Sequence, residues 1–357
     1  MKTGMRTRLI SRVLTPALLI TATATAQDLK TVTDIPVNPL SVSGLRDLAQ
    51  TVSAEFKPEY ERQALEGIQQ RVVSFDVDGL RQYALILEPP GTAPNEGWPV
   101  LLMNHGHHPN PPQYGRVASG ETDRPGDYYR ALPMAFARFG FLVVVPDFRG
   151  HNDSEGAKFA HGPLESNWYS RDAIAAFRAI DSIPEAHKHN RFMWGHSMGG
   201  AVTLRAMLAL QNEIKGASIW ASTTTDAWKN SVYHSLHQEG LSDSLLTEKP
   251  PLNLLNSDIN ALPFDFKPEQ GDTARFLREL ETPLSIHHSV LDLKSTPYNW
   301  SVELAGKLYA LQKPYYFYSY AGDKHLFEGE NLNEAIMRDV AFFNSLSSSP
   351  TTEPGDN

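Results

Sequence analysis

The feature that most constrains the fold is the motif Gly-His-Ser-Met-Gly-Gly at residues 195–200, which lies between two apolar segments. One apolar run ends just before it, and a run that favours a helix begins at Ala201. This pattern is typical of a sharp turn from a strand into a helix, on which Ser197 would project above a sheet. We expect glycines beside the serine because side chains there would collide with the neighbouring strand and helix. The start of the helix would then offer free N–H groups to a developing oxyanion.

Short apolar runs alternate with segments of helical spacing across residues 100–345. The runs at 100–104, 141–145 and 217–221 are largely apolar, as expected for parallel strands that are buried on both faces. Helical spacing separates them, for example at 167–183. The alternation predicts an α/β fold with a mostly parallel central sheet and helices on both faces. Further strands are predicted at 283–287 and 315–318, and further helices at 127–139, 300–311 and 333–346.

The segment before this alternation predicts two kinds of structure. Residues 27–69 are polar with two weak helical patterns, at 43–56 and 58–69. We expect them to form an N-terminal extension that packs on the main domain. Residues 71–79 and 82–87 are apolar or alternating on either side of a turn, which predicts a β-hairpin.

The main domain is expected to span residues 70–346 and to be interrupted once. Residues 223–280 are polar, contain Pro250-Pro251 and break the alternation. They predict a cap inserted into the sheet domain, and a long connection is the alternative. Residues 347–357 are rich in Ser, Thr, Pro and Gly, which predicts a disordered tail.

The N-terminus has the features of a secretory signal peptide. Residues 1–26 contain four basic residues and no acidic one, an apolar run at 13–20, and Ala24 and Ala26 in the arrangement of a cleavage site. The apolar run is shorter than the roughly 20 residues needed to span a bilayer. We therefore expect cleavage near Ala26 and a secreted or periplasmic protein that has no membrane association once the signal is removed.

Charge and cysteine content exclude several classes of function. The net charge is −9, and it becomes −13 once the four basic residues of the signal are removed. An acidic body argues against binding to nucleic acids or to anionic membrane surfaces. The sequence contains no cysteine, which excludes disulfides, thiolate metal sites and a cysteine nucleophile. No carboxylate stands at ligand spacing from His107 and His108, so no metal is expected.

Candidate catalytic residues follow the predicted strands, where chemistry is located in folds of this kind. His105-Gly106-His107 follows one strand, Asp292 follows the penultimate strand, and His325 follows the last one. Ser197, Asp292 and His325 follow one another in the order nucleophile, acid, base, which is one of the chain orders known for catalytic triads. Asp323 is an alternative acid, but a residue two positions from His325 in a turn tends to bond local backbone N–H groups. We therefore predict that Asp292 is the acid.

Taken together, these motifs resemble the α/β-hydrolase superfamily, and within it the prolyl-oligopeptidase and dienelactone-hydrolase-like group. The motifs are His105-Gly106, Asp147-x-Arg149-Gly150-His151-x-Asp153-Ser154, Gly195-His196-Ser197-Met198-Gly199-Gly200, Ile286-His287-His288 with Asp292, Pro297-x-x-Trp300-Ser301 and Gly322-Asp323-Lys324-His325. The resemblance covers about residues 70–345. It departs from the family pattern at Ser289, where the acid loop usually has glycine.

The resemblance implies a serine hydrolase with a Ser-His-Asp triad that forms an acyl-enzyme. Ser197 would be the nucleophile, His325 the base, and Asp292 the acid that orients His325. The backbone N–H groups of Met198 and His107 would hold the oxyanion. No cofactor is needed, and the expected substrate is a small carboxylic ester. The alternatives are an exopeptidase or amidase that acts on short peptides, and a catalytically inactive hydrolase fold used for binding.

Overall fold

The computed structural model describes residues 38–107, 131–159, 164–226, 229–230, 233, 262–322 and 324–347. The predicted signal peptide, residues 1–26, lies outside the described residues, as do Asp323 and all of the predicted tail except Ser347. None of the helices in the described ranges is both long enough and apolar enough to cross a membrane.

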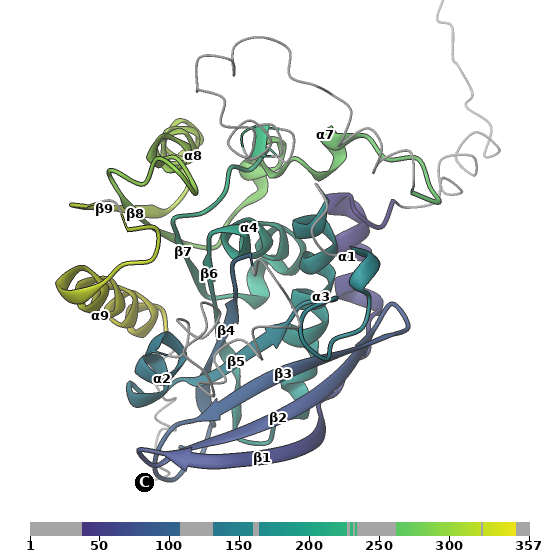
Figure 1. Cartoon of the computed structure of the whole chain (residues 1–357), viewed down its shortest axis with the longest axis vertical. Helices are drawn as coiled ribbons and strands as arrows, with labels where there is room; N and C mark the ends of the chain where they lie inside the picture. Colours follow the sequence, from purple (N-terminus) through teal and green to yellow (C-terminus); the bar gives the residue numbers. More distant parts are fainter. Residues whose placement is uncertain are drawn as a thin grey trace, which may run out of the picture. The chain divides into compact units, whose positions relative to one another are not determined.

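The described residues form a nine-stranded sheet with helices on its two faces (Figure 1). The strands are β1 (Lys57–Leu65), β2 (Ile68–Val77), β3 (Leu80–Glu88), β4 (Trp98–Asn104), β5 (Leu142–Asp147), β6 (Ala186–His196), β7 (Gly216–Trp220), β8 (Leu284–Ser289) and β9 (Tyr315–Tyr320). The helices are α1 (Val42–Thr51), α2 (Ala131–Arg138), α3 (Glu165–Ala179), α4 (Met198–Leu210), α7 (Pro268–Gly271), α8 (Tyr298–Ala310) and α9 (Gly329–Leu346).

The sheet is antiparallel at one end and parallel through the rest. Its strand order is β1-β2-β3-β5-β4-β6-β7-β8-β9. The first three pairings in this order are antiparallel, and every pairing from β5 to β9 is parallel. The carboxyl ends of the parallel strands therefore meet at one edge, where folds of this kind bind their ligands. The predicted mostly parallel α/β sheet is confirmed.

The side chains of β4 show how the core is divided between the two faces. Val100 and Leu102 belong to a cluster with α1, α3, α4 and α8, whereas Leu101 and Met103 belong to a second cluster with α2 and α9. This alternation follows from the two-residue period of a strand. All four side chains are buried, so the strand is covered on both faces, as its apolar sequence predicts. Figure 1 shows α1, α3 and α4 on one side of the sheet and α2 and α9 on the other.

The N-terminal region confirms one of its two predicted helices and contradicts the other. The first helical pattern, 43–56, largely coincides with α1, which begins after Ser41 and packs against α3 and α4. The second pattern, 58–69, is wrong as a helix, because these residues form β1 and the start of β2. Most of β1 is exposed, and it pairs with β2 along its length. Backbone pairing with a neighbouring strand, rather than an apolar face, therefore determines the structure of β1.

The predicted β-hairpin is confirmed by β2 and β3. These strands pair antiparallel around Asp78 and Gly79, whose φ angles are +54° and +73°. Both central residues of a two-residue type I′ turn need positive φ, which explains why Asp-Gly occupies this turn.

The predicted cap, residues 223–280, lies mostly outside the described residues. In the part described at its end, α7 is followed by two short 3-10 turns, Thr273–Arg275 and Leu277–Glu279. Leu277 and Leu280 are buried in the core cluster that contains α4. This end of the segment is therefore part of the main domain, and the cap itself stays a prediction.

Candidate active site

Ser197 lies on a sharp, strained turn between β6 and α4. Its φ and ψ angles are 58° and −123°, a conformation that is rare for a residue with a side chain. A Cβ on Gly195 would lie 2.2 Å from the backbone oxygen of Gly199, and a Cβ on Gly199 would lie 2.0 Å from that of Asn104. Both positions therefore require glycine because strand and helix backbones approach closely there. The expected reason for the flanking glycines is confirmed.

The backbone of Ser197 is held from the neighbouring strand β7. Its N–H donates to the carbonyl oxygen of Trp220 at 2.9 Å. Its own carbonyl oxygen accepts hydrogen bonds from the N–H groups of Gly200 at 3.0 Å and of Thr223 at 3.1 Å. Met198 follows as the first residue of α4, where backbone N–H groups have no partner within the helix. These contacts fix the serine at the carboxyl edge of the sheet.

The predicted acid and base lie together at the same edge. Asp292 follows β8, His325 follows β9, and these two strands are parallel neighbours. His325 Nδ1 lies 2.6 Å from Asp292 Oδ2. Because a carboxylate only accepts hydrogen bonds, Nδ1 carries a proton, and Nε2 of a neutral ring is left as the acceptor. The His325 ring also lies 4.5 Å from the ring of His196, the residue that precedes Ser197.

Backbone hydrogen bonds join the acid loop to the histidine loop. The N–H of Val290 donates to Tyr320 at 2.9 Å, and the N–H of Leu291 donates to Gly322 at 3.0 Å. Ser289 Oγ donates to the carbonyl oxygen of Lys324 at 2.7 Å. The departure from glycine at position 289 thus supplies a hydroxyl that bonds the residue immediately before His325.

Asp292 is a buried carboxylate that stays ionised. Burial raises its pKa, but His288 and His325 outweigh burial and hold the pKa well below the usual range. His288 Nε2 lies 3.6 Å from Oδ2, and Thr296 Oγ1 lies 3.1 Å from the same oxygen. Ser295 N–H donates to the other oxygen at 3.3 Å. The carboxylate can therefore orient His325 and stabilise a positive charge on its ring.

His196 acts as a packing residue of the turn. It is fully buried, and its Nε2 donates to the backbone oxygen of His325 at 3.0 Å. Burial and the proximity of His325 hold the pKa of His196 well below the usual histidine range. A neutral His196 therefore connects the nucleophile strand to the histidine loop without carrying charge.

The predicted oxyanion residue His107 follows β4 at the same edge of the sheet. Its side chain is 46% exposed, and Nδ1 lies 3.6 Å from Glu165 Oε1 at the start of α3. Burial lowers the pKa of His107, but the Glu165 carboxylate outweighs it and the net shift is upward. The role expected of His107 depends on its backbone N–H and stays a prediction, as does that of Met198. Within the described ranges, no group of three or more acidic or histidine side chains is arranged to hold a metal ion.

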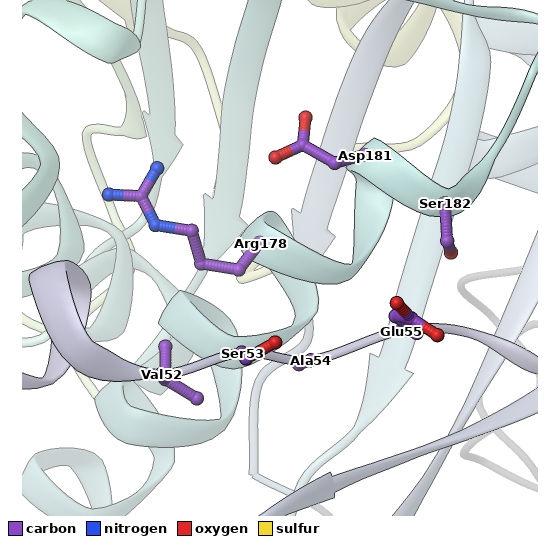
Figure 2. A pocket seen from close by; sticks show the side chains of 7 residues that line it. All are labelled: Val52, Ser53, Ala54, Glu55, Arg178, Asp181 and Ser182. Carbon is purple, nitrogen blue, oxygen red and sulfur yellow. The ribbon is translucent and has the colours of Figure 1, made fainter.

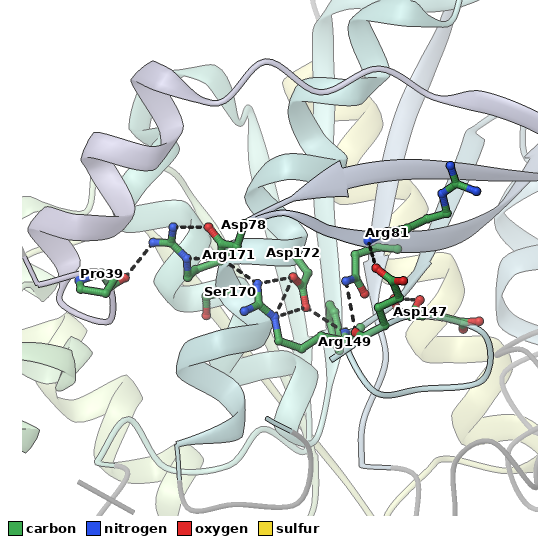
Figure 3. A network of polar contacts seen from close by, with 12 residues as sticks. Pro39, Asp78, Arg81, Asp147, Arg149, Ser170, Arg171 and Asp172 are labelled. Carbon is green, nitrogen blue, oxygen red and sulfur yellow. Dashed lines mark hydrogen bonds and ion pairs between the residues drawn. The ribbon is translucent and has the colours of Figure 1, made fainter. Parts of the chain in front are cut away.

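A buried ionic network lies where β5 ends and was not recognised as a unit from the sequence (Figure 3). Arg149, which follows β5, is fully buried and pairs with Asp172 at 2.7 Å and with Asp78 at 2.9 Å. Arg171 pairs with Asp78 at 2.6 Å and donates to the carbonyl oxygen of Pro39 at 3.0 Å. Burial lowers the pKa of Arg149, but the two carboxylates outweigh burial and the net shift of the pKa is upward. The guanidinium therefore stays charged. The network joins the β2–β3 turn, the loop after β5, α3 and the segment before α1, so Arg149 holds separate segments of the fold together.

A shallow depression of about 270 Å³ lies between the segment after α1 and the end of α3 (Figure 2). Its lining is Val52, Ser53, Ala54, Glu55, Arg178, Asp181 and Ser182. The end of α3 leads into the amino end of β6, so this depression does not lie at the edge that carries Ser197. Arg178 already donates to the carbonyl oxygen of Ala49 at 2.8 Å and pairs with Glu213. The charge of Arg178 therefore serves internal contacts.

The fold and the arrangement at the carboxyl edge define an α/β hydrolase. Comparisons with known proteins agree: the family described as serine aminopeptidase, S33, matches residues 118–258, which include Ser197. The chain is 24% identical over 269 residues to the uncharacterized peptidase YtmA of Bacillus subtilis (strain 168), covering 74% of this chain and 88% of the relative. The protein is therefore a hydrolase with the α/β-hydrolase fold.

Two solved structures show the same fold in enzymes with different named activities. One is a puromycin-hydrolyzing peptidase of Mycobacterium tuberculosis, with a TM-score of 0.61 and 18% identity, covering 79% of this chain and 40% of that one. The other is acetyl xylan esterase 1 of Thermoanaerobacterium sp. JW/SL YS485, with a TM-score of 0.59 and 14% identity, covering 86% of this chain and 92% of that one. The chain thus spans less than half of the mycobacterial peptidase and nearly all of the esterase.

Proposed function

We propose that this protein is a secreted serine hydrolase that cleaves small carboxylic esters through an acyl-enzyme. Ser197 is the nucleophile, His325 the general base, and Asp292 the acid that orients His325. The observation that carries the proposal is the 2.6 Å contact between His325 Nδ1 and Asp292 Oδ2, next to the strained turn of Ser197. This combination supports a nucleophile that is activated by an oriented imidazole.

The reaction follows from these positions. Ser197 Oγ attacks the ester carbonyl carbon while His325 Nε2 takes the hydroxyl proton. The carbonyl oxygen becomes an oxyanion, which the backbone N–H groups of Met198 and His107 stabilise. His325 then gives its proton to the departing alcohol, leaving the acyl group on Ser197. Water attacks this acyl-enzyme with His325 again as base, which releases the carboxylic acid and restores the serine.

Hydrolysis of peptides or amides is a second candidate for the same residues. The S33 match and the relationship to a protein named as a peptidase support it directly. The chemistry differs only in the leaving group, since His325 would protonate an amine instead of an alcohol. Substrate preference therefore separates the two candidates.

The first prediction tests the nucleophile. Ser197→Ala should abolish labelling by a fluorophosphonate probe and lower kcat by about 10⁵–10⁶-fold, because only binding and oxyanion stabilisation remain. Ser345→Ala, whose hydroxyl bonds Phe342 within α9, is the matched control and should label like the unmodified protein. Labelling that persists in Ser197→Ala would refute the assignment of the nucleophile.

The same protein can be tested for substrate class and export. Turnover of p-nitrophenyl esters of graded chain length is compared with turnover of aminoacyl anilides, and faster anilide turnover would favour the peptidase.

Export is proposed on the character of residues 1–26. Mass spectrometry of the exported protein should find Gln27 at the N-terminus, and recovery of the intact N-terminus would contradict export through this signal.

A further inference from the structure

The hydroxyl of Thr296 contacts the acid, the base and the end of β7 at once. Thr296 is 1% exposed and lies in the loop between Asp292 and α8. Its Oγ1 lies 2.8 Å from the carbonyl oxygen of Ala221, 3.1 Å from Asp292 Oδ2 and 3.3 Å from His325 Nδ1. Neither the triad motifs nor the resemblance assigns a role to this side chain.

The chemistry of a hydroxyl accounts for all three contacts. It has one proton and two lone pairs, and a backbone carbonyl can only accept a hydrogen bond. Asp292 Oδ2 can likewise only accept, so the hydroxyl proton is shared between the carbonyl oxygen of Ala221, which is the nearer acceptor, and this carboxylate oxygen. A lone pair of Thr296 Oγ1 is left for the Nδ1 proton of His325, which Asp292 already accepts. When His325 takes the serine proton, its ring becomes positive, and a polarised hydroxyl oxygen near Nδ1 stabilises that charge.

The contact with Ala221 also connects the acid–base pair to the nucleophile. Ala221 follows β7 with a φ of +42°, and its N–H donates to the carbonyl oxygen of His287 on β8 at 2.7 Å. The residue before it, Trp220, accepts the hydrogen bond from the N–H of Ser197. Thr296 is thus bonded to the same short stretch of backbone that holds Ser197.

We propose that Thr296 is a positioning residue of the reaction, whose hydroxyl holds Asp292 and His325 in register with Ser197. The inference rests on the proposed function, because it assigns Thr296 a role in the same triad. A purely structural role would predict that loss of the hydroxyl lowers stability alone. A positioning role predicts that it lowers kcat while substrate binding is retained.

Thr296→Val is the decisive change because valine has nearly the same shape as threonine. A methyl group in place of the hydroxyl would lie 3.1 Å from a carboxylate oxygen and 3.3 Å from a ring nitrogen. Those separations are shorter than the roughly 3.5–4.0 Å at which carbon makes favourable contacts, so the acid–base pair must shift. We expect kcat to fall by about 10–30-fold, with KM within about twofold, on p-nitrophenyl acetate.

Two further variants remove alternative explanations. Thr296→Ser keeps the hydroxyl and should recover most of kcat, and Thr296→Ala should repeat the loss without placing a methyl group near the pair. Thr282→Val is the matched control for a buried threonine, since its hydroxyl contacts the carbonyl oxygens of Gln211 at 3.1 Å and Ile214 at 3.3 Å. It should lower the melting temperature and leave kcat unchanged.

The measurements are kcat, KM and melting temperature for all four variants and the unmodified protein. Unchanged kcat in Thr296→Val and Thr296→Ala would overturn the inference, as would a serine variant no more active than the valine variant. An unmodified protein that neither hydrolyses esters or anilides nor reacts with a fluorophosphonate would instead refute the proposed function. The two failures are therefore distinguishable.

Discussion

Two short contacts between a histidine and an aspartate lie close to β8 and β9, and they differ in how the histidine is surrounded. His325 Nδ1 lies 2.6 Å from Asp292 Oδ2, and the His325 side chain is 25% exposed. His287 Nε2 lies 2.9 Å from Asp339 Oδ1, and both of these side chains are fully buried. Distance alone would make the two pairs similar candidates for general-base catalysis.

The nitrogen atoms of the histidine rings separate the two pairs. His287 Nδ1 lies 2.8 Å from Tyr320 Oη, and its Nε2 also lies 2.7 Å from Ser285 Oγ. Both nitrogens of His287 are thus occupied inside the core, where no substrate proton can reach them. His325 uses Nδ1 for its carboxylate and is partly exposed at the carboxyl edge beside the turn of Ser197. A histidine–aspartate contact therefore supports catalysis only where the second nitrogen can face a substrate.

The largest effect that can break this comparison is expected at Asp292. Asp292→Asn removes the acceptor that keeps the proton on Nδ1 of His325, so the ring can adopt the wrong tautomer. We expect kcat to fall by about 10³–10⁴-fold, with folding intact by circular dichroism. Asp323→Asn is the matched control, and its cost should be at most about tenfold, through loop stability. A crippled Asp323 variant beside a nearly normal Asp292 variant would show that the acid is misassigned.

The opposite pattern is expected at Asp339. Its Oδ2 accepts a hydrogen bond from Trp220 Nε1 at 2.8 Å, and its other oxygen contacts His287. Asp339→Asn changes a fully buried polar group and should lower the free energy of unfolding by about 2–4 kcal/mol. Because neither residue reaches the substrate, kcat of the folded fraction should change little. Urea unfolding and steady-state kinetics check both statements, and a loss of kcat comparable to that of Asp292→Asn would remove the distinction between the pairs.

The sequence was sufficient for the parts of the molecule that depend on local pattern. Buried parallel strands are largely apolar, so the runs at 100–104 and 141–145 predicted β4 and β5. The glycines at 195 and 199 predicted the turn of Ser197 because only glycine tolerates the close backbone contacts there. The pairing of Asp292 with His325 followed from placing both after adjacent strands.

The parts that the sequence missed depend on contacts between distant segments. β1 has no apolar face and exists because it pairs with β2, so its spacing was misread as helical. Thr296 and Asp339 gave no signal because their partners come from other strands and loops. Ser289 did give a signal, as a departure from the family pattern, but its bond to Lys324 became visible only in the structure.

A smaller effect, on the pH dependence of stability, is expected at His196, a third histidine that can be compared with His325 and His287. This buried histidine bonds a backbone carbonyl instead of a carboxylate, and its pKa is held well below the usual value of about 6.5. Below about pH 6.5 the unfolded chain binds a proton at His196 that the folded chain does not bind. The stabilisation that a neutral, buried His196 gives the fold is therefore fully present above about pH 6.5. It is lost as pH falls, at up to about 1.4 kcal/mol per pH unit.

Other groups act with or against this change. The raised pKa of His107 acts in the opposite direction, while the stabilisation from the lowered pKa of Asp292 begins to be lost only below about pH 4. His196→Gln isolates the effect, because the glutamine amide can still donate to the backbone oxygen of His325 but does not titrate. Urea unfolding at pH 7.5 and 5.5 should show a loss of stability in the unmodified protein that exceeds the loss in the variant by about 1–1.5 kcal/mol. Equal losses in the two proteins would mean that His196 is protonated in the folded state, and that the turn beside Ser197 tolerates a buried charge.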